Sequence, residues 1–318
     1  MSHNTHNTNN LLNGGRRPSQ DQKNNDKDNN NDNNDKGNNK DINSNDFQDR
    51  RYHNATNDII TMMNAQHELM RNVWKGDFIS PIEEDLIVGG LHILDIGCGN
   101  GTWLLQLAQD YPLNNYTGID MSPIFPKNIP PQSKINFIQT NILQGLPFES
   151  NEFDFVHMRF LNTSFTEKQW GEIVIPDLTR VTKPRRWLEL CEIDMDGQSI
   201  GPTSRRMITT LTSYLESKGI NGLIGEEIPD FLESTNKFSA IYSEEKFSKI
   251  GKWAGNLGEI AVKSFTSEFR SMKDLPKWMG IGEEEFNEMV DKCVLEFDDY
   301  RSYFISYRFY CQKRDSTL

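Results

Sequence analysis

Residues 91–101 read LHILDIGCGNG, an apolar run that breaks into three alternating glycines at positions 97, 99 and 101. The apolar half suits a buried strand, and the spacing of apolar residues that follows, from Trp103 to Ala108, is that of a helix. A strand, a glycine turn and a helix bring backbone N–H groups and a helix N-terminus up to a ligand. The stretch therefore predicts an open α/β sheet with a ligand site at the end of this strand.

An acidic residue follows at the distance expected for a nucleoside ligand. The strand-like run Tyr116–Ile119 ends in Asp120, which lies 19 residues beyond Gly101. An acid about 20 residues past such a turn usually binds the two hydroxyls of a ribose. The glycine turn and this acid together predict a ligand that contains ribose.

The charge of Asp95, at the end of the first strand, helps to choose that ligand. A dinucleotide would place a pyrophosphate on the turn, and like charges a few ångströms apart repel by about 1 kcal/mol even in water. S-adenosylmethionine (SAM) carries an ammonium and a sulfonium and no phosphate, so a carboxylate favours it. The spacing GxGxG also departs from the dinucleotide pattern GxGxxG. An NAD(P)-dependent oxidoreductase is therefore the less favoured alternative.

The segment DIGCGNGTW, Asp95–Trp103, resembles the glycine-rich motif of class I SAM-dependent methyltransferases, in a branch common in fungi. The resemblance runs from about residue 51 to the C-terminus and is strongest over residues 91–160. It implies a Rossmann-like α/β fold. This fold has a seven-stranded, mostly parallel sheet with an antiparallel last strand, helices on both faces and a helical cap.

The same resemblance implies which residues bind the cofactor SAM. Asp120 would bind the ribose hydroxyls, Met121 would pack on the adenine, and Asn141 with Ile142 would contact the edge of the adenine. The methionine part of SAM would lie against the glycine motif, at Asp95, Gly97, Cys98, Gly99 and Gly101.

Polar residues at the ends of two later strands are the candidates for the acceptor side. Phe153–Val156 predicts a strand that leads to His157 and Arg159, and Trp187–Glu192 predicts the next strand. Ligands of open α/β sheets bind at the carboxyl ends of the strands. We predict that His157 is the general base and that Arg159 and Glu192 contact the substrate. The alternative for each is a structural role at the strand end.

The chain departs from the family pattern at Pro184–Arg185–Arg186, where the family usually has Pro-Gly-Gly. Glycines there permit the left-handed backbone of a tight turn, which arginine resists at about 1 kcal/mol. The departure keeps open a second interpretation, a methyltransferase-like binding or regulatory protein with weak or no catalysis.

Composition limits the partners and the location. The net charge of −12 disfavours nucleic acid and anionic membranes as partners. We see no signal peptide and no membrane-spanning run, so we expect a cytoplasmic protein, with the nucleus as the alternative. The four cysteines have no metal-binding spacing, so we expect no metal. The expected methyl acceptor is a small molecule, with a protein as the second choice.

Four parts of the chain differ in composition and pattern. They are a disordered Asn/Asp-rich tail (1–46), an N-terminal helical segment (47–90), a SAM-binding core (91–200), and a helical cap with the last strands (201–318). In the last part, the resemblance implies that Ile241–Ile250 and Tyr303–Cys311 form an antiparallel hairpin.

Overall fold

The computed structural model describes residues 57–315 of the chain, so the tail predicted over residues 1–46 lies outside the described residues. The strands are β1 His92–Ile96, β2 Asn115–Asp120, β3 Ile135–Gln139, β4 Phe153–Arg159, β5 Thr182–Ile193, β6 Phe238–Lys249 and β7 Tyr303–Lys313. The α-helices are α2 Asn57–Trp74, α3 Glu83–Val88, α4 Thr102–Asp110, α5 Glu167–Gln169, α6 Ile175–Val181, α7 Pro202–Glu216, α8 Ile228–Ser234, α9 Asn256–Ser271, α10 Leu275–Met279 and α11 Glu283–Tyr300. Short turns of other helix types are η1 Ile142–Gln144, η2 Trp170–Val174, η3 Ile224–Glu226 and η4 Lys252–Ala254.

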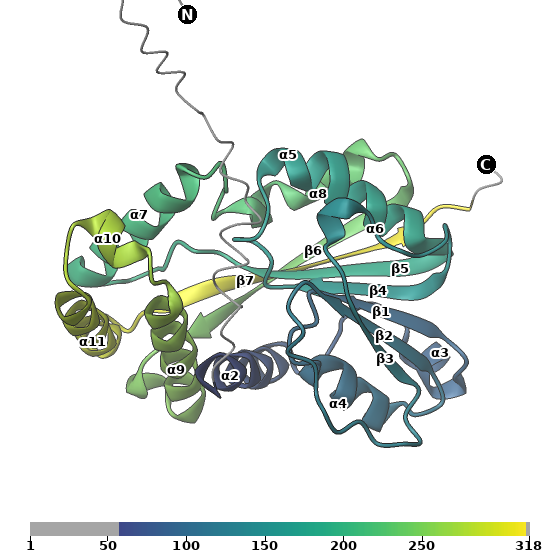
Figure 1. The fold of residues 1–318 in the computed structure, drawn as a ribbon, viewed down its shortest axis with the longest axis horizontal. Coiled ribbons are helices and arrows are strands. Elements are labelled where there is room, and N and C mark those ends of the chain that lie inside the picture. The colour runs from purple at the N-terminus through teal and green to yellow at the C-terminus, as the bar shows by residue number, and fades with distance from the viewer. Residues whose placement is uncertain (1–56, 316–318) are drawn as a thin grey trace, which may run out of the picture. The chain divides into compact units, whose positions relative to one another are not determined.

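The strands form one seven-stranded sheet in the order β3-β2-β1-β4-β5-β7-β6 (Figure 1). β1 to β5 pair in parallel, whereas β7 runs antiparallel to both β5 and β6. In the hairpin, Ile241 pairs with Cys311 and Lys249 with Tyr303. The predicted sheet and its C-terminal hairpin are therefore confirmed.

Helices cover both faces of the sheet, because the central strands are apolar on both sides. On one face, Ile93 of β1 packs in a core with Leu86 of α3 and Trp103 of α4. On the other face, the next residue, Leu94, packs in a core that includes Leu178 of α6 and residues of α8. Figure 1 shows α3 and α4 on one side of the sheet and α6 and α8 on the other.

A third core joins the N-terminal helix to the helices added late in the chain. α7 follows β5, and α9, α10 and α11 lie between β6 and β7; we call these four the cap helices. Met70 of α2 is buried in one cluster with Leu211 of α7, Phe269 of α9 and Phe297 of α11. Figure 1 shows α2 lying beside α9, so residues far apart in the sequence pack together.

The departure at Pro184–Arg185–Arg186 lies inside β5, and the strand continues through it. Arg185 has a φ of 61°, the left-handed conformation for which the family pattern has glycine. Its side chain is mostly exposed, whereas Arg186 forms ion pairs with Asp85 (2.6 Å) and Asp154 (3.1 Å). The chain therefore keeps the turn and accepts a strained arginine there.

Replacing Arg185 with glycine is expected to raise the free energy of unfolding by about 1 kcal/mol, because glycine adopts this conformation without a steric penalty. Urea unfolding of the purified protein measures the change. Arg186→Gly is the control, and it should lower stability because its ion pairs are lost. A lower stability of Arg185→Gly would show that the arginine is not strained at this turn.

Candidate active site

The turn after β1 has a backbone that only glycine adopts easily. Gly97, Gly99 and Gly101 have φ values of 66°, 55° and 72°. A Cβ on Gly97 would lie 2.8 Å from the Leu161 side chain, and one on Gly101 would lie 2.5 Å from the Phe137 ring. Side chains at these positions would therefore push neighbouring residues away, and the bare backbone forms part of the site.

Asp120, at the end of β2, is tied to this turn by hydrogen bonds. Its Oδ2 accepts from the Gly99 N–H at 2.9 Å, and its Oδ1 accepts from the Ser122 N–H at 2.8 Å. Burial raises the pKa of the Asp120 carboxyl, while the N–H groups of Ser122 and Gly99 oppose that rise. The two bonds fix the orientation of the carboxylate at the end of the strand.

A cavity opens at the carboxyl ends of the parallel strands. It extends from the glycine turn to α2, α7, α9 and the ends of β6 and β7. Seven of the predicted cofactor residues line it, namely Gly97, Cys98, Gly99, Asp120, Met121, Asn141 and Ile142. Asp95 and Gly101 are not among the lining residues.

Asn141 is held in a defined orientation at this wall. Its Oδ1 accepts a hydrogen bond from the Leu143 N–H at 2.9 Å and so caps η1. Because an amide oxygen has a second lone pair, this cap leaves acceptor capacity on the side chain. Ile142, the next residue, is buried beside it and supplies an apolar surface.

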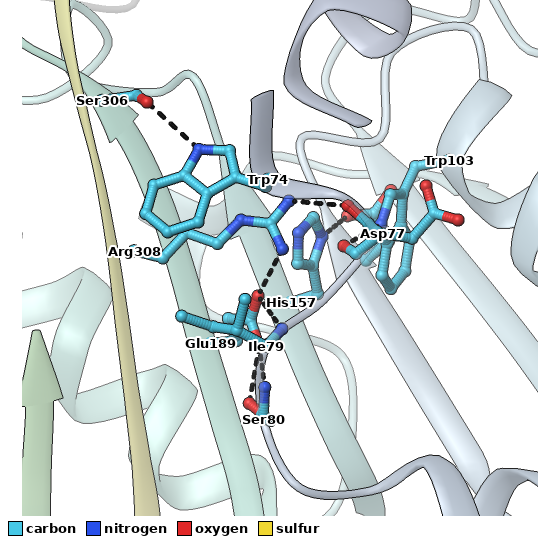
Figure 2. Close-up of polar contacts among 11 residues, drawn as sticks. Trp74, Asp77, Ile79, Ser80, Trp103, His157, Glu189, Ser306 and Arg308 are labelled. Atoms are coloured by element: carbon cyan, nitrogen blue, oxygen red, sulfur yellow. Dashed lines mark hydrogen bonds and ion pairs between the residues drawn. The ribbon is translucent and has the colours of Figure 1, made fainter. Parts of the chain in front are cut away.

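Asp95 lies beneath the cavity and is paired with His157. The Asp95 side chain is 3% exposed, and its Oδ1 lies 2.8 Å from His157 Nδ1. The Trp103 ring stacks on the imidazole, with centroids 3.9 Å apart and an interplanar angle of 6°. Trp103 Nε1 in turn donates to the Asp77 carbonyl at 2.9 Å. Figure 2 shows His157 and Trp103 close together beside Asp77.

This position corrects the prediction that His157 is the general base. His157 is fully buried and does not line the cavity, because it lies two residues before the end of β4 and the Trp103 ring of α4 covers its imidazole. Side chains two residues apart lie on the same face of a strand, so Arg159 follows it on that face. Arg159 is at the end of β4, and it does line the cavity.

Arg159 faces the cavity without a carboxylate partner among residues 57–315. Its Nη2 lies 3.2 Å from Nδ1 of His67, and its guanidinium lies 5.5 Å from the Phe160 ring. Burial, and then the charge of Arg159, lower the pKa of His67 to about 3. His67 is therefore neutral near pH 7, and its Nδ1 can accept from the guanidinium.

Glu192 does not reach the cavity, although the sequence predicted a substrate contact there. It is fully buried, and its oxygens accept from the N–H groups of Leu161 (3.0 Å) and Asn162 (3.1 Å). The side chain thus holds the loop after β4, which was the structural alternative. Asp194, two residues later, does line the cavity.

A buried ion pair lies next to the Asp95–His157 pair. Glu189 is the register partner of His157 on β5, and its Oε1 lies 3.3 Å from Arg308 Nη1. Glu189 also accepts from the N–H groups of Ile79 and Ser80 and from the Ser80 hydroxyl, at 2.6–3.1 Å. These groups converge in Figure 2. The loop after α2 is therefore anchored to the middle of the sheet.

Arg308 extends the same anchor to the end of α2. Its Nη2 donates to the Gly76 carbonyl at 3.3 Å, and its guanidinium lies 5.0 Å from the Trp74 ring. Trp74 Nε1 donates to the Ser306 hydroxyl at 3.1 Å. Because α2 supplies part of the cavity wall, this cluster also fixes one side of the cavity.

Several lining residues had no distinguishing signal in the sequence. They include Met63 on α2, and Ser248 and Phe304 from the cap side. Aromatic and apolar residues at helical spacing are also what an ordinary core requires. A serine in a strand is too common to single out.

Comparison with known proteins agrees with the topology. Residues 93–185 match a family model described as a methyltransferase domain. This part of the chain is therefore similar to methyltransferase domains. The matched segment runs from β1 into β5 and includes the glycine turn and Asp120.

Curated methyltransferases match part of this chain over part of their own length. Methyltransferase str2 of Strobilurus tenacellus is 29% identical over 48% of this chain and 55% of its own. N-methyltransferase tcpN of Claviceps purpurea is 33% identical over 45% of this chain and 50% of its own. The chain thus spans about half the length of these relatives. Among solved structures, phosphoethanolamine N-methyltransferase 2 of Haemonchus contortus has a TM-score of 0.49 and 17% identity, over 86% of this chain and 60% of that one.

None of the helices between residues 57 and 315 has the length and apolar character needed to cross a bilayer. In that same part of the chain, no group of three or more His, Cys, Asp or Glu side chains is placed to hold a metal ion.

Glu192 predicts a pH dependence of stability. Burial raises its pKa from 4.5 to about 8, against the opposing effect of the backbone N–H groups. The unfolded chain therefore loses this proton at lower pH than the folded chain does. The stabilisation is complete below about pH 4.5 and is lost as the pH rises towards 8. Each unit of the shift corresponds to about 1.4 kcal/mol.

The glutamine of the Glu192→Gln variant does not titrate. The free energy of unfolding of this variant should therefore rise relative to that of the wild type as the pH rises. Urea unfolding of both proteins between about pH 4.5 and 8 measures the difference. A difference that stays constant with pH would show that Glu192 is ionised throughout.

Glu189→Ala is expected to lower the free energy of unfolding by about 3 kcal/mol, because Arg308 would remain buried without a counter-charge. Arg270→Ala, which breaks the exposed pair with Asp291, is the control and should cost less than about 1 kcal/mol. Denaturant unfolding measures both. Similar losses in the two variants would mean that the buried pair has no special weight.

Proposed function

We propose that the chain binds SAM along the glycine turn and transfers its methyl group to a small-molecule acceptor held in the same cavity. The observation that carries this proposal is the shared cavity. One part of its wall comes from the methyltransferase motif residues and another from the cap helices. A cofactor and an acceptor that share one space can react directly, and proximity alone supplies much of the rate in such transfers.

The residues along the glycine turn fit SAM in chemistry as well as in position. Asp120 offers two oriented carboxylate oxygens to the hydroxyls of a ribose. Met121 and Ile142 provide apolar surfaces for the adenine, and Asn141 retains acceptor capacity for its amino group. Gly97 and Gly99 leave room against the backbone of the turn. SAM would supply the electrophilic methyl group.

The charges at this end of the cavity favour a cofactor without phosphate. Asp120 and the nearby Asp95 are both acids, and none of the residues from Gly97 to Asp120 that line the cavity is basic. A pyrophosphate would meet repulsion at this turn. This supports SAM over a nicotinamide dinucleotide.

Three polar residues at the strand ends are given separate roles. We assign His157 to positioning, because it fixes Asp95 below the glycine turn. Glu192 positions the loop that follows β4 through two backbone N–H groups. Arg159 is the residue of the three that can touch a bound molecule, through an anionic or strongly polar group in the cavity. A general base is needed only when the acceptor must lose a proton.

Calorimetric titration with SAM, S-adenosylhomocysteine and NAD(H) tests the cofactor. We expect SAM and its product to bind and NAD(H) not to bind. Asp120→Ala should weaken SAM binding by about 10- to 100-fold, because hydrogen bonds to a charged acceptor are lost. Asp230→Ala, at an exposed residue of α8, is the matched control and should bind SAM as the wild type does.

Binding of NAD(H) in place of SAM, or equal SAM binding by Asp120→Ala and the wild type, would overturn the cofactor assignment. Tight binding of SAM with no S-adenosylhomocysteine formed across an acceptor library would favour the binding or regulatory interpretation over catalysis.

A further inference from the structure

The cavity wall formed by the cap side differs in character from the wall formed by the methyltransferase motif. Its main members come from α7, α9, β7, the end of β6 and the residue that follows β6. We call them the cap wall, and they are Ile208, Ser248, Ile250, Phe265, Phe269 and Phe304. Five of the six are apolar, and none carries a charge. This wall therefore suits an apolar part of a ligand.

Three aromatic rings dominate the cap wall and hold one another in place. The Phe265 ring lies 4.4 Å from the Phe269 ring and 6.1 Å from the Phe304 ring, measured between centroids. Phe265 also meets Phe297 edge-on at 4.8 Å and 90°, which fixes it from behind. Rings clustered in this way favour flat, ring-containing ligands by offset or edge contacts.

Ser248 is the polar exception in the cap wall. It pairs in register with Phe304 and is 4% exposed. Its Oγ is buried and has no hydrogen-bond partner within the described residues, although the residue lines the cavity. A buried hydroxyl without a partner is unfavourable. A ligand group that hydrogen bonds to it would recover that loss.

The charged residues around the cavity disfavour a highly anionic acceptor. Of the described lining residues, Arg159 is the only cation, whereas Asp120, Asp194 and Glu268 are acids. Glu268 lies on α9, the helix that also carries Phe265 and Phe269. A phosphorylated acceptor would therefore meet net repulsion near the cap wall.

We propose that the cap wall is the acceptor subsite, and that it takes a neutral, ring-containing molecule with one hydroxyl or amino group hydrogen bonded to Ser248. The rings pack against Phe265, Phe269 and Phe304, and the polar group fixes the orientation of the molecule. This inference rests on the proposed function only in treating the other wall as the cofactor's.

Two matched probes test the subsite: 2-naphthol and 2-methylnaphthalene, which share a ring system and differ in the hydroxyl. Affinities are measured by saturation-transfer NMR on the full chain, with and without S-adenosylhomocysteine. We expect 2-naphthol to bind more tightly. Ser248→Ala should lower the affinity for 2-naphthol about 3- to 10-fold and leave the affinity for 2-methylnaphthalene unchanged. Phe265→Ala should lower the affinity for both probes.

Ser243→Ala, an exposed serine on the same strand, is the control and should change neither affinity. Equal affinities for 2-naphthol in Ser248→Ala and the wild type would overturn the proposal, as would failure of both probes to bind. S-adenosylhomocysteine binding, measured separately by calorimetry, reports on the proposed function and on the folding of each variant. If it fails in the wild type, the proposed function fails while the naphthol data still decide the subsite.

Discussion

The hydrogen bond from the Gly99 N–H to the Asp120 carboxylate joins the glycine turn after β1 to the end of the neighbouring strand. It requires a backbone that turns sharply at Gly97 and Gly99, and it fixes an acid at the mouth of the cavity. α4 begins directly after the turn, at Thr102. The proposed cofactor half of the cavity is built around this contact.

Below the cavity, the sheet contains a row of buried charged and polar groups. Asp95, His157 and Glu189 are register neighbours on β1, β4 and β5, and Arg308 of β7 lies against Glu189. Such groups are costly in a core unless they are paired. Here the pairing extends to backbone N–H groups of the loop after α2 through Ser80. The polar contacts of this row therefore hold α2 in position, and α2 forms one wall of the cavity.

The sequence predicted the strands and the glycine turn because each has a short-range pattern, whereas the hairpin was implied by the family resemblance. The left-handed conformation of Arg185 was not predicted, because the family pattern has glycine there and arginine resists this backbone. His157 was assigned by its place near the end of β4, but the pattern does not tell how close to the strand end the cavity begins, and Trp103 covers the imidazole. The prediction that Glu192 contacts the substrate was also wrong, because its carboxylate points to the loop after β4. Ser248 carried no signal, because its importance comes from packing with elements distant in sequence.

β7 follows all the other described strands in sequence, yet it lies between β5 and β6. During synthesis on the ribosome, β6 must therefore wait unpaired until β7 has emerged and can insert beside it. Glu189 also lacks its counter-ion until then, because Arg308 is on β7. The sheet cannot be completed progressively from the N-terminus. Nascent chains of this protein would thus expose an open strand edge and an uncompensated carboxylate, a natural target for chaperones until translation has passed β7.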